Sequence, residues 1–395
     1  MRILIINSAY PPIQYGGAEV SVSLLANALV NHGDEVAVIS LHQGEDETCG
    51  TVDGVRVYRC PIDNFYWPFG LRQKPSVMAR LLWHLRELWN SRAAERVGRI
   101  MDIEKPDVVH TNNITGFSVS IWREARRRRI RLVHTLRDYG LICLHSGMFR
   151  GKSVCKRQCL DCKVYSSIRR LCSQQVDAVV SNSSYVLTAH KKSGFFVNVP
   201  SEVIYNIAGT SPKERVEPQD RSDDVLNFGY IGELDERKGV RAILESTRHL
   251  KLSNWKLRIA GRGLEQYVAK LKADYPDPRI QWLGFVKATD FYTTVDVVIV
   301  SSIWPEPLPR SLIEALALGR SAICARSGGI PEISQLGKLV EMYSPCDYRE
   351  LAGIMDRAMK DVTRWRSGGF TDPSAADVFT ESVVVARYRE VYRGS

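Results

Sequence analysis

The sequence predicts an α/β protein made of two doubly wound halves that face one another across a ligand-binding cleft. Short runs of aliphatic and β-branched residues alternate with amphipathic helical stretches. This alternation stops at a polar, proline-containing segment, residues 209–224, and then restarts. The 395 residues also exceed what one ordinary hydrophobic core holds. We therefore expect domains at residues 1–208 and 225–374, a linker at 209–224, and a C-terminal helix at 375–395 that crosses back to the first domain.

The net charge and the lengths of the apolar runs limit which partners and which cellular location the protein can have. The net charge of +10 indicates an anionic partner, which could be nucleotide phosphates, nucleic acid or a membrane surface. No nucleic-acid-binding motif supports the second of these, so we expect no nucleic-acid partner. The apolar start is too short for a signal peptide and no window is long enough to span a bilayer. We expect a cytoplasmic protein. Peripheral contact of its basic N-terminal half with the inner face of the membrane is an alternative that the sequence leaves open.

The first half contains two features at the ends of predicted strands, which are residues 2–8, 35–40, 107–111, 132–135, 177–182 and 202–206. Gly16 and Gly17 follow the first strand and precede an amphipathic helix, where they either let the backbone approach a ligand closely or only make a turn. His134 lies at the carboxyl end of its strand, where open α/β sheets bind ligands. A lone histidine at this place is either catalytic or structural.

Residues 65–89 interleave tryptophans with arginines. The helix within this segment has five apolar residues on one face, Val77, Leu81, Leu82, Leu85 and Leu88. It could lie on an anionic membrane surface. It could also pack on its own domain with a solvated basic side, which is the more common arrangement and the one that we expect.

Five of the nine cysteines lie in residues 143–172: Cys143, Cys155, Cys159, Cys162 and Cys172. The spacing of Cys155, Cys159 and Cys162 is close to that of metal-ligand pairs, with Cys143 or Cys172 as a fourth thiolate. This pattern predicts either a structural zinc site, for which we take Cys143 as the fourth ligand, or a loop with free thiols. In both cases the segment is an insertion that shapes a pocket.

The second half contains the most informative stretch, residues 296–319. Its predicted strands are residues 226–231, 255–260, 280–284, 295–301 and 321–324. After the fourth strand, a proline-punctuated turn leads into an amphipathic helix, and Glu306 and Glu314 frame that turn and helix start. The first N–H groups of a helix lack internal partners and bind anions. Carboxylates beside such a site are suited to accept hydroxyls from groups attached to the anion, such as sugars flanking a diphosphate.

Five motifs along the chain together resemble a known family. They are Gly16-Gly17-Ala18-Glu19, His134-Thr135 with Asp138-Tyr139, Gly232-x5-Lys238-Gly239, Ala260-Gly261-x-Gly263 and Glu306-x7-Glu314. In this order and these positions they resemble a family 4 retaining glycosyltransferase of GT-B architecture, in a variant with a cysteine-bearing loop. The resemblance covers nearly the whole chain and implies two Rossmann-like domains.

The resemblance implies three catalytic residues. Glu306 would bind the hydroxyls of the donor sugar, Lys238 would neutralise the charge of the leaving diphosphate, and His134 would lie beside the reacting sugar. It also implies a donor-binding set: Gly16, Gly17, Glu233, Lys238, Arg262, Glu306, Arg310, Ser311, Leu312 and Glu314. In this set Glu314 would bind the ribose, and the N–H groups that follow Pro309 would face the diphosphate.

Two positions depart from the family pattern. Glu233 stands where the family usually has a diphosphate-binding arginine, and Arg137 replaces the usual histidine before Asp138. The second change indicates an anionic acceptor. For the first we hypothesise a charge exchange, in which Arg262, together with Arg310, supplies the missing cation and Glu233 pairs with Arg262.

The implied activity is metal-independent transfer, with retention, of a hexose from a UDP- or GDP-sugar. The acceptor would be a glycan or a lipid-linked molecule in cell-surface polysaccharide or glycoconjugate synthesis. No cofactor is required, because a lysine and a helix N-terminus take the place of a metal ion. Two alternatives are a GT-B nucleotide-sugar epimerase, against which the Glu306-x7-Glu314 pair argues, and a degenerate nucleotide-sugar-binding protein, which Glu233 favours.

Overall fold

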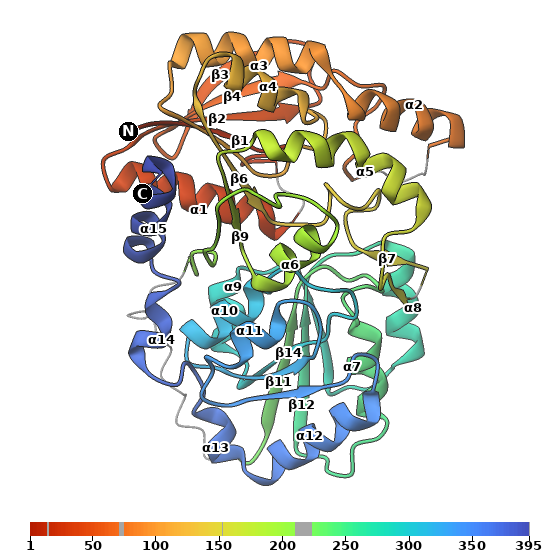
Figure 1. Cartoon of the computed structure of the whole chain (residues 1–395). Helices are drawn as coiled ribbons and strands as arrows, with labels where there is room; N and C mark the ends of the chain where they lie inside the picture. Colours follow the sequence, from red (N-terminus) through yellow and green to blue (C-terminus); the bar gives the residue numbers. More distant parts are fainter. Residues whose placement is uncertain (14–15, 71–74, 152, 210–222, 395) are drawn as a thin grey trace. The chain divides into compact units, whose positions relative to one another are not determined.

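The computed structural model describes the chain except for residues 14–15, 71–74, 152, 210–222 and 395 (Figure 1). The chain divides into two compact units. Unit 1 comprises Met1–Met148, Cys155–Ile207 and Glu381–Ser395, and unit 2 comprises Phe149–Val154 and Ala208–Thr380. The division after Ile207 lies beside the predicted end of the first domain at residue 208. Most of the predicted linker, 209–224, lies outside the described residues.

Unit 1 is built on a sheet whose described strands run in the order β10-β9-β6-β5-β1-β2-β4-β3. The pairs are parallel except for β3 and β4, which are antiparallel. The strands are β1 (Arg2–Ile6), β2 (Glu35–His42), β3 (Thr48–Val52), β4 (Val55–Pro61), β5 (Val108–Thr111), β6 (Arg131–Leu136), β9 (Ala178–Ser181) and β10 (Ser201–Val203). The central strands β5 and β9 are buried along their whole length, as expected of parallel strands that are covered on both faces.

The helices of unit 1 are α1 (Gly17–Asn31), α2 (Val77–Leu88), α3 (Ser91–Glu104), α4 (Ser120–Arg127), α5 (Leu160–Cys172), α6 (Ser184–Lys192) and α15 (Glu381–Arg393), with a 3-10 turn η1 (Ser173–Gln175) after α5. Side chains that favour helix starts define several of them: Ser76 accepts from the Ala79 N–H, and Ser183 accepts from the Val186 N–H. No described helix is long and apolar enough to cross a membrane.

Helix α2 turns most of its apolar residues to solvent, which is the opposite of what we expected. Its residues Val77, Leu81, Leu82 and Leu85 are exposed, and its buried residues are Trp83 and Glu87. The expected packing of the apolar face on the domain was therefore wrong. Residues 71–74 of the aromatic and basic segment lie outside the described residues.

The C-terminal helix α15 belongs to unit 1, and in Figure 1 this dark-blue helix lies beside the red helix α1. Arg389 binds Asp34 at 2.9 Å, and the Tyr392 hydroxyl lies 2.8 Å from the Nδ1 atom of His110 on β5. His110 and Tyr392 are both buried. The hydrophobic core of unit 1 therefore includes side chains from the last residues of the chain.

Unit 2 contains a parallel sheet with the described strand order β13-β12-β11-β14-β15-β16. Its strands are β11 (Leu226–Ile231), β12 (Trp255–Ala260), β13 (Ile280–Gly284), β14 (Val297–Val300), β15 (Ser321–Ala325) and β16 (Val340–Tyr343), and a separate hairpin pairs β7 (Phe149–Arg150) with β8 (Ser153–Val154). From β11 the chain winds toward β13 on one side and from β14 toward β16 on the other. Open α/β sheets bind ligands outside the carboxyl ends of the strands at such a switch point.

The helices of unit 2 are α7 (Val240–Thr247), α8 (Glu265–Asp274), α9 (Ala288–Thr293), α10 (Arg310–Ala317), α11 (Ile330–Ser334), α12 (Tyr348–Lys360), α13 (Val362–Arg366) and α14 (Pro373–Asp377). Of the predicted donor-binding residues, Glu233 and Lys238 lie in the loop after β11, Glu306 lies in the loop after β14, and α10 carries Arg310, Ser311, Leu312 and Glu314.

Tyr392→Phe tests how much α15 contributes to unit 1. The change leaves the ring in place but removes the hydroxyl that bonds the buried His110 ring. We expect a loss of about 1–3 kcal/mol, because a buried polar atom then lacks its partner. Thermal unfolding measures this as a decrease in Tm of about 2–4 °C per kcal/mol. The matched control is Tyr348→Phe, whose hydroxyl makes no hydrogen bond to the described residues. Equal Tm values for the two variants would contradict the prediction.

Candidate active site

The carboxylate of Glu306 is the centre of the unit 2 site. It is 8% exposed and lies in the loop between β14 and α10. The Lys238 ammonium binds both of its oxygens, at 2.7 and 3.0 Å. The Ser302 hydroxyl and the Trp304 indole N–H each donate to its Oε2 atom at 2.8 Å. A buried carboxylate is stable only with several such donors, so this arrangement fixes its orientation.

Lys238 comes from the loop after β11, and main-chain contacts hold this loop against the one after β14. The Ile303 N–H donates to the Arg237 carbonyl at 2.8 Å, and the Ser301 hydroxyl donates to the Lys238 carbonyl at 2.7 Å. Gly239 has a φ of +71°, and a Cβ atom there would lie 2.0 Å from the Ser301 carbonyl oxygen. The glycine that follows Lys238 is therefore required both by its conformation and by the close approach of the two loops.

A third loop, between β15 and α11, fixes the main chain of Glu306. The Gly329 N–H donates to the Glu306 carbonyl at 2.8 Å. Gly328 has a φ of +58°, and a Cβ atom there would lie 2.1 Å from the same carbonyl oxygen. The glycine-rich loop thus places the backbone of Glu306, while Lys238, Ser302 and Trp304 place its side chain.

Glu314 lies in the second turn of α10, and its carboxylate is held by Arg310 at 2.8 Å and by the Tyr292 hydroxyl at 3.1 Å. Among the described residues no side chain caps the N-terminus of α10, which begins after Pro309. The Leu312 N–H, which we expected to face a diphosphate, donates to the Pro309 carbonyl at 3.2 Å. The Leu312 N–H is therefore already bonded within the first turn, whereas the Ser311 N–H donates to no described residue.

The hypothesised pairing of Glu233 with Arg262 was wrong. The Glu233 carboxylate is 55% exposed and lies 3.9 Å from Arg237, four residues further along the chain. The Arg262 guanidinium lies over the Phe285 ring, 4.5 Å from its centroid. Arg237 binds Asp235 more closely, at 2.8 Å, so Glu233 has only a long contact with it. The donor-binding role of Arg262 remains a prediction.

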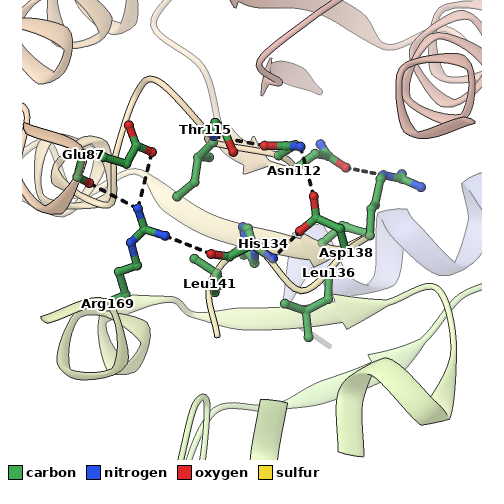
Figure 2. A pocket seen from close by; sticks show the side chains of 13 residues that line it. Glu87, Asn112, Thr115, His134, Leu136, Asp138, Leu141 and Arg169 are labelled. Atoms are coloured by element: carbon green, nitrogen blue, oxygen red, sulfur yellow. Dashed lines mark hydrogen bonds and ion pairs between the residues drawn. The ribbon is translucent and has the colours of Figure 1, made fainter. Parts of the chain in front are cut away.

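The unit 1 site is a small cavity of about 20 Å³ at the carboxyl ends of β5 and β6, with room for about one water molecule. Figure 2 shows Glu87 and Arg169 on one side of it and Asn112 and Asp138 on the other. Asp138 accepts hydrogen bonds from the Asn113 side chain at 3.0 Å and from the Gly140 N–H at 2.7 Å. Burial raises the pKa of Asp138.

His134 lines this cavity but is only 2% exposed. Its Nδ1 atom lies 2.9 Å from the Thr111 hydroxyl, and its ring stacks on Phe196 and meets the edge of Trp122. Burial lowers the pKa of His134 to about 3, with smaller contributions from His190 and Arg137. The ring is therefore neutral near pH 7, so it can offer a hydrogen bond but cannot act as a cationic acid. Its predicted place beside the reacting sugar remains a prediction.

Arg137 is also buried beside the cavity, and its Nε atom donates to the Asn112 side chain at 2.7 Å. The anionic acceptor that we inferred from this arginine remains a prediction. Gly16 is the N-cap residue of α1, and its N–H donates to the Glu19 carboxylate at 2.9 Å. Gly17 is the first residue of that helix. The glycine motif therefore starts α1, and its contact with a ligand is likewise a prediction.

The cysteine segment does not assemble the predicted zinc site. Across the described part of the chain, no three His, Cys, Asp or Glu side chains converge in an arrangement that could hold a metal ion. Cys143, Cys155, Cys159 and Cys162 form no disulfide in the described chain. The described residues therefore do not form the zinc site that the spacing predicts.

The sequence reasoning missed several residues of these sites. Ser302 and Trp304 bind Glu306, Gly328 holds its backbone, and Glu87 and Arg169 line the cavity of unit 1. The requirement that a buried carboxylate has donors could have pointed to Ser302 and Trp304, which lie within four residues of Glu306. No pattern in the sequence relates Glu87 to Arg169.

Gly239→Ala tests whether the packing of the two loops shapes the Glu306 site. We expect it to destabilise the protein by more than the cost of a positive φ alone, which is about 1–2 kcal/mol, because its Cβ atom meets the Ser301 carbonyl. The matched control is Gly284→Ala, which has a φ of +69° but nothing within 4 Å of the added Cβ atom. Urea unfolding measures both, and equal losses would show that the loops do not pack as described.

Two family models match the chain in succession. The model described as "Glycosyl transferase 4-like domain" matches residues 16–206, and the model described as "Glycosyl transferases group 1" matches residues 213–366. An uncharacterized 42.6 kDa protein in the cps region of Klebsiella pneumoniae is 29% identical over 394 residues, which is 100% of both chains. Spore coat protein SA of Bacillus subtilis is 23% identical over 338 residues, covering 74% of this chain and 86% of that protein.

Solved structures show the same fold. The Anabaena protein Alr3699/HepE in complex with UDP and glucose has a TM-score of 0.73 at 18% identity, with 100% of each chain covered. Sucrose-phosphate synthase from Thermosynechococcus elongatus has a TM-score of 0.74 at 17% identity, with 100% of this chain and 98% of that chain covered. The predicted GT-B fold class, with two Rossmann-like α/β domains, is confirmed. The two family models match successive parts of the chain. The chain is therefore a glycosyltransferase, with a 4-like domain followed by a group 1 domain.

Proposed function

We propose that this glycosyltransferase moves a hexose from a UDP- or GDP-sugar to a glycan or lipid-linked acceptor, with retention and without a metal ion. The observation that supports this most is the Lys238 ammonium, held at both oxygens of the buried Glu306 on the loop that leads into α10. A fixed cation from the loop after β11 thus meets a fixed carboxylate on the loop that leads into the first turn of α10.

These groups suit the charges that develop in sugar transfer. When the bond between the anomeric carbon and the phosphate oxygen breaks, its electron pair stays on the departing diphosphate and the sugar becomes oxocarbenium-like. Lys238 and the first N–H groups of α10 would stabilise the diphosphate, and one such donor contributes about 2.7–4 kcal/mol. The acceptor oxygen forms the new bond to the anomeric carbon, and its proton passes to the diphosphate. Retention is proposed from the family resemblance.

Glu306 and Glu314 would hold the two ends of the donor. Glu306 is oriented by three donors of its own and would accept hydroxyls of the sugar. Glu314 lies further along α10, where Tyr292 and Arg310 orient it toward the ribose in our proposal. Ribose hydroxyls are present in both UDP and GDP, so Glu314 fits either donor.

The relatives support the donor and the biological setting. Alr3699/HepE has been solved with UDP-glucose, and another structure of similar fold is the lipopolysaccharide outer core galactosyltransferase WaaB. Two of the relatives lie in the cps region of Klebsiella pneumoniae. We therefore propose a hexose donor and a place in cell-surface polysaccharide or glycoconjugate synthesis.

Lys238→Ala tests the proposal in an assay that measures release of the nucleoside diphosphate. We expect kcat/KM to fall about 100- to 1,000-fold, because the fixed cation at the leaving group is lost. The matched control is Lys338→Ala, which removes an exposed lysine from the same unit and should leave turnover unchanged.

In the same series Arg262→Ala should weaken donor binding, and unchanged donor binding would exclude Arg262 from the site.

The same assay separates the alternatives. Turnover in the presence of EDTA is expected to equal turnover without it, and a loss that Mg²⁺ or Mn²⁺ restores would contradict metal independence. An epimerase would convert the sugar of the donor without needing an acceptor. Nucleotide binding with no turnover on any acceptor would favour the degenerate binding protein. Equal rates for Lys238→Ala and Lys338→Ala would overturn the proposed role of Lys238.

A further inference from the structure

Two neighbouring helices of unit 1, α2 and α5, carry apolar faces that nothing in the described chain covers. Residues Val77, Met78, Leu81, Leu82 and Leu85 of α2 are 75%, 63%, 52%, 42% and 54% exposed. Residues Leu160, Val164, Ile168 and Leu171 of α5 are 75%, 65%, 37% and 74% exposed. We call these nine residues the apolar face. Most soluble domains do not expose large side chains in such a concentration, and a patch of this kind indicates an interaction site.

The positions along each helix show that the apolar face is continuous on its own helix. At about 100° per residue, the five α2 residues fall within an arc of about 140°, and the four α5 residues within about 80°. Trp83 and Glu87 lie on the opposite side of α2 and are buried. Ser166 and Arg169 lie on the opposite side of α5 and are also buried. Each helix therefore places a charged residue, Glu87 or Arg169, on its inner side and a row of large apolar residues on its outer side.

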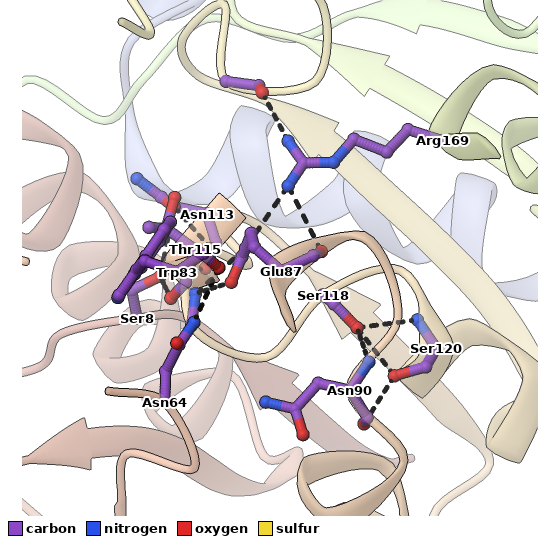
Figure 3. A network of polar contacts seen from close by, with 12 residues as sticks. Ser8, Asn64, Trp83, Glu87, Asn90, Asn113, Thr115, Ser118, Ser120 and Arg169 are labelled. Atoms are coloured by element: carbon purple, nitrogen blue, oxygen red, sulfur yellow. Dashed lines mark hydrogen bonds and ion pairs between the residues drawn. The ribbon is translucent and has the colours of Figure 1, made fainter. Parts of the chain in front are cut away.

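An inward ion pair joins the two helices. Figure 3 shows Arg169 reaching Glu87, with 3.5 Å between the guanidinium and the carboxylate. The other Glu87 contacts are with the Gly116 N–H, at 3.0 and 3.1 Å, and Arg169 also donates to the Gly140 carbonyl at 2.9 Å. Burying such charges is costly, and so is leaving nine aliphatic side chains in water. An ordinary surface helix turns its apolar side to the core and its charged side to solvent. The reversed orientation of α2 and α5 indicates that the apolar face has a partner.

The charges around the apolar face indicate what that partner is. The exposed charged residues on α2, on α5 and in the turn before α5 are Arg80, Lys156, Arg157, Lys163 and Arg170, together with a single acid, Asp161. The whole chain has a net charge of +10. A second copy docking face to face would bring this basic set against itself. An apolar face with basic flanks complements an anionic lipid surface, where acyl chains receive the aliphatic residues and headgroups receive the cations.

We propose that the apolar face of α2 and α5 docks on an anionic phospholipid bilayer, with Arg80, Lys156, Arg157, Lys163 and Arg170 at the headgroups. The helices lie on the surface and do not cross it. Docking brings unit 1 to the place where a lipid-linked acceptor is held. The docking proposal does not depend on the proposed transferase activity, because vesicle binding is measured without donor or acceptor.

Co-sedimentation of the full chain with vesicles tests the proposal. We expect sedimentation with vesicles of phosphatidylcholine that contain about 30% phosphatidylglycerol, and none with phosphatidylcholine alone. Leu81→Glu/Leu85→Glu and Leu160→Glu/Val164→Glu should each lower the partition coefficient about tenfold or more. Lys163→Glu/Arg170→Glu should lower it by at least about fivefold per removed charge. All of these side chains are exposed, so the fold should persist, which Tm measurements check.

The matched control is Ile103→Glu, which places the same charge on a 65% exposed apolar residue of α3. It should bind vesicles as the unchanged protein does. The proposal is overturned if the unchanged protein stays in the supernatant, or if Ile103→Glu loses binding as much as the α2 and α5 variants do. It is also overturned if light scattering shows a dimer that these variants dissociate while the vesicles bind nothing, since the apolar face would then join two copies of the chain.

Discussion

The site in unit 2 depends on one buried ion pair, that of Lys238 with Glu306. A carboxylate that is 8% exposed is stable only where donors surround it, and Lys238, Ser302 and Trp304 supply them. The pair also requires close main-chain packing, since glycines allow the loops after β11, β14 and β15 to approach one another. The strand order places the first two of these loops together at the switch point of the sheet. Fold, glycines and charge thus combine to fix one cation and one carboxylate beside a helix N-terminus.

Unit 1 uses its charges differently. The Glu87 and Arg169 pair lies inside, between α2 and α5, and the aliphatic residues of these helices lie outside. Burial raises the pKa of Glu87 to about 7, and Arg169 and the Gly116 N–H offset this only in part. The same pair lines the cavity at the carboxyl ends of β5 and β6. The two helices that carry the proposed membrane face therefore also contribute one residue each to the lining of this cavity.

Most of the fold could be predicted from the sequence because parallel, doubly covered strands appear as continuous aliphatic runs. The strands β1 and β14 are of this kind. The strands β3, β4, β7, β8 and β16 were missed. β3 is polar and exposed, β4 contains two arginines and a proline, β7 and β8 have two residues each, and β16 includes an acid and is mostly half-buried. The orientation of α2 was also wrong, because a periodic apolar stripe shows that a helix is amphipathic but not what its apolar side meets.

The candidate site was partly predictable because some of its residues belong to motifs that are visible in the sequence. Five motifs in order along the chain, the Glu306-x7-Glu314 pair among them, pointed to the family, and the structure brings Lys238 and Glu306 together. The partner of Glu233 was misjudged, since Arg237, four residues along the chain, lies within reach and Arg262 stacks on Phe285. Contacts between residues that are far apart in sequence, such as Glu87 with Arg169, follow from packing and leave no local pattern.

The central claim is that the Lys238 and Glu306 site holds a nucleotide sugar. The most direct measurement is a thermal-shift titration of the full chain against UDP-, GDP- and ADP-sugars in buffer with EDTA. A ligand that binds only the folded state stabilises it by about 2.7 kcal/mol at 100 times its Kd. We predict that a UDP- or GDP-sugar raises Tm in a concentration-dependent way, and that the same titration of Glu306→Gln shows a smaller shift. No shift with any donor, or an undiminished shift in Glu306→Gln, would contradict the account.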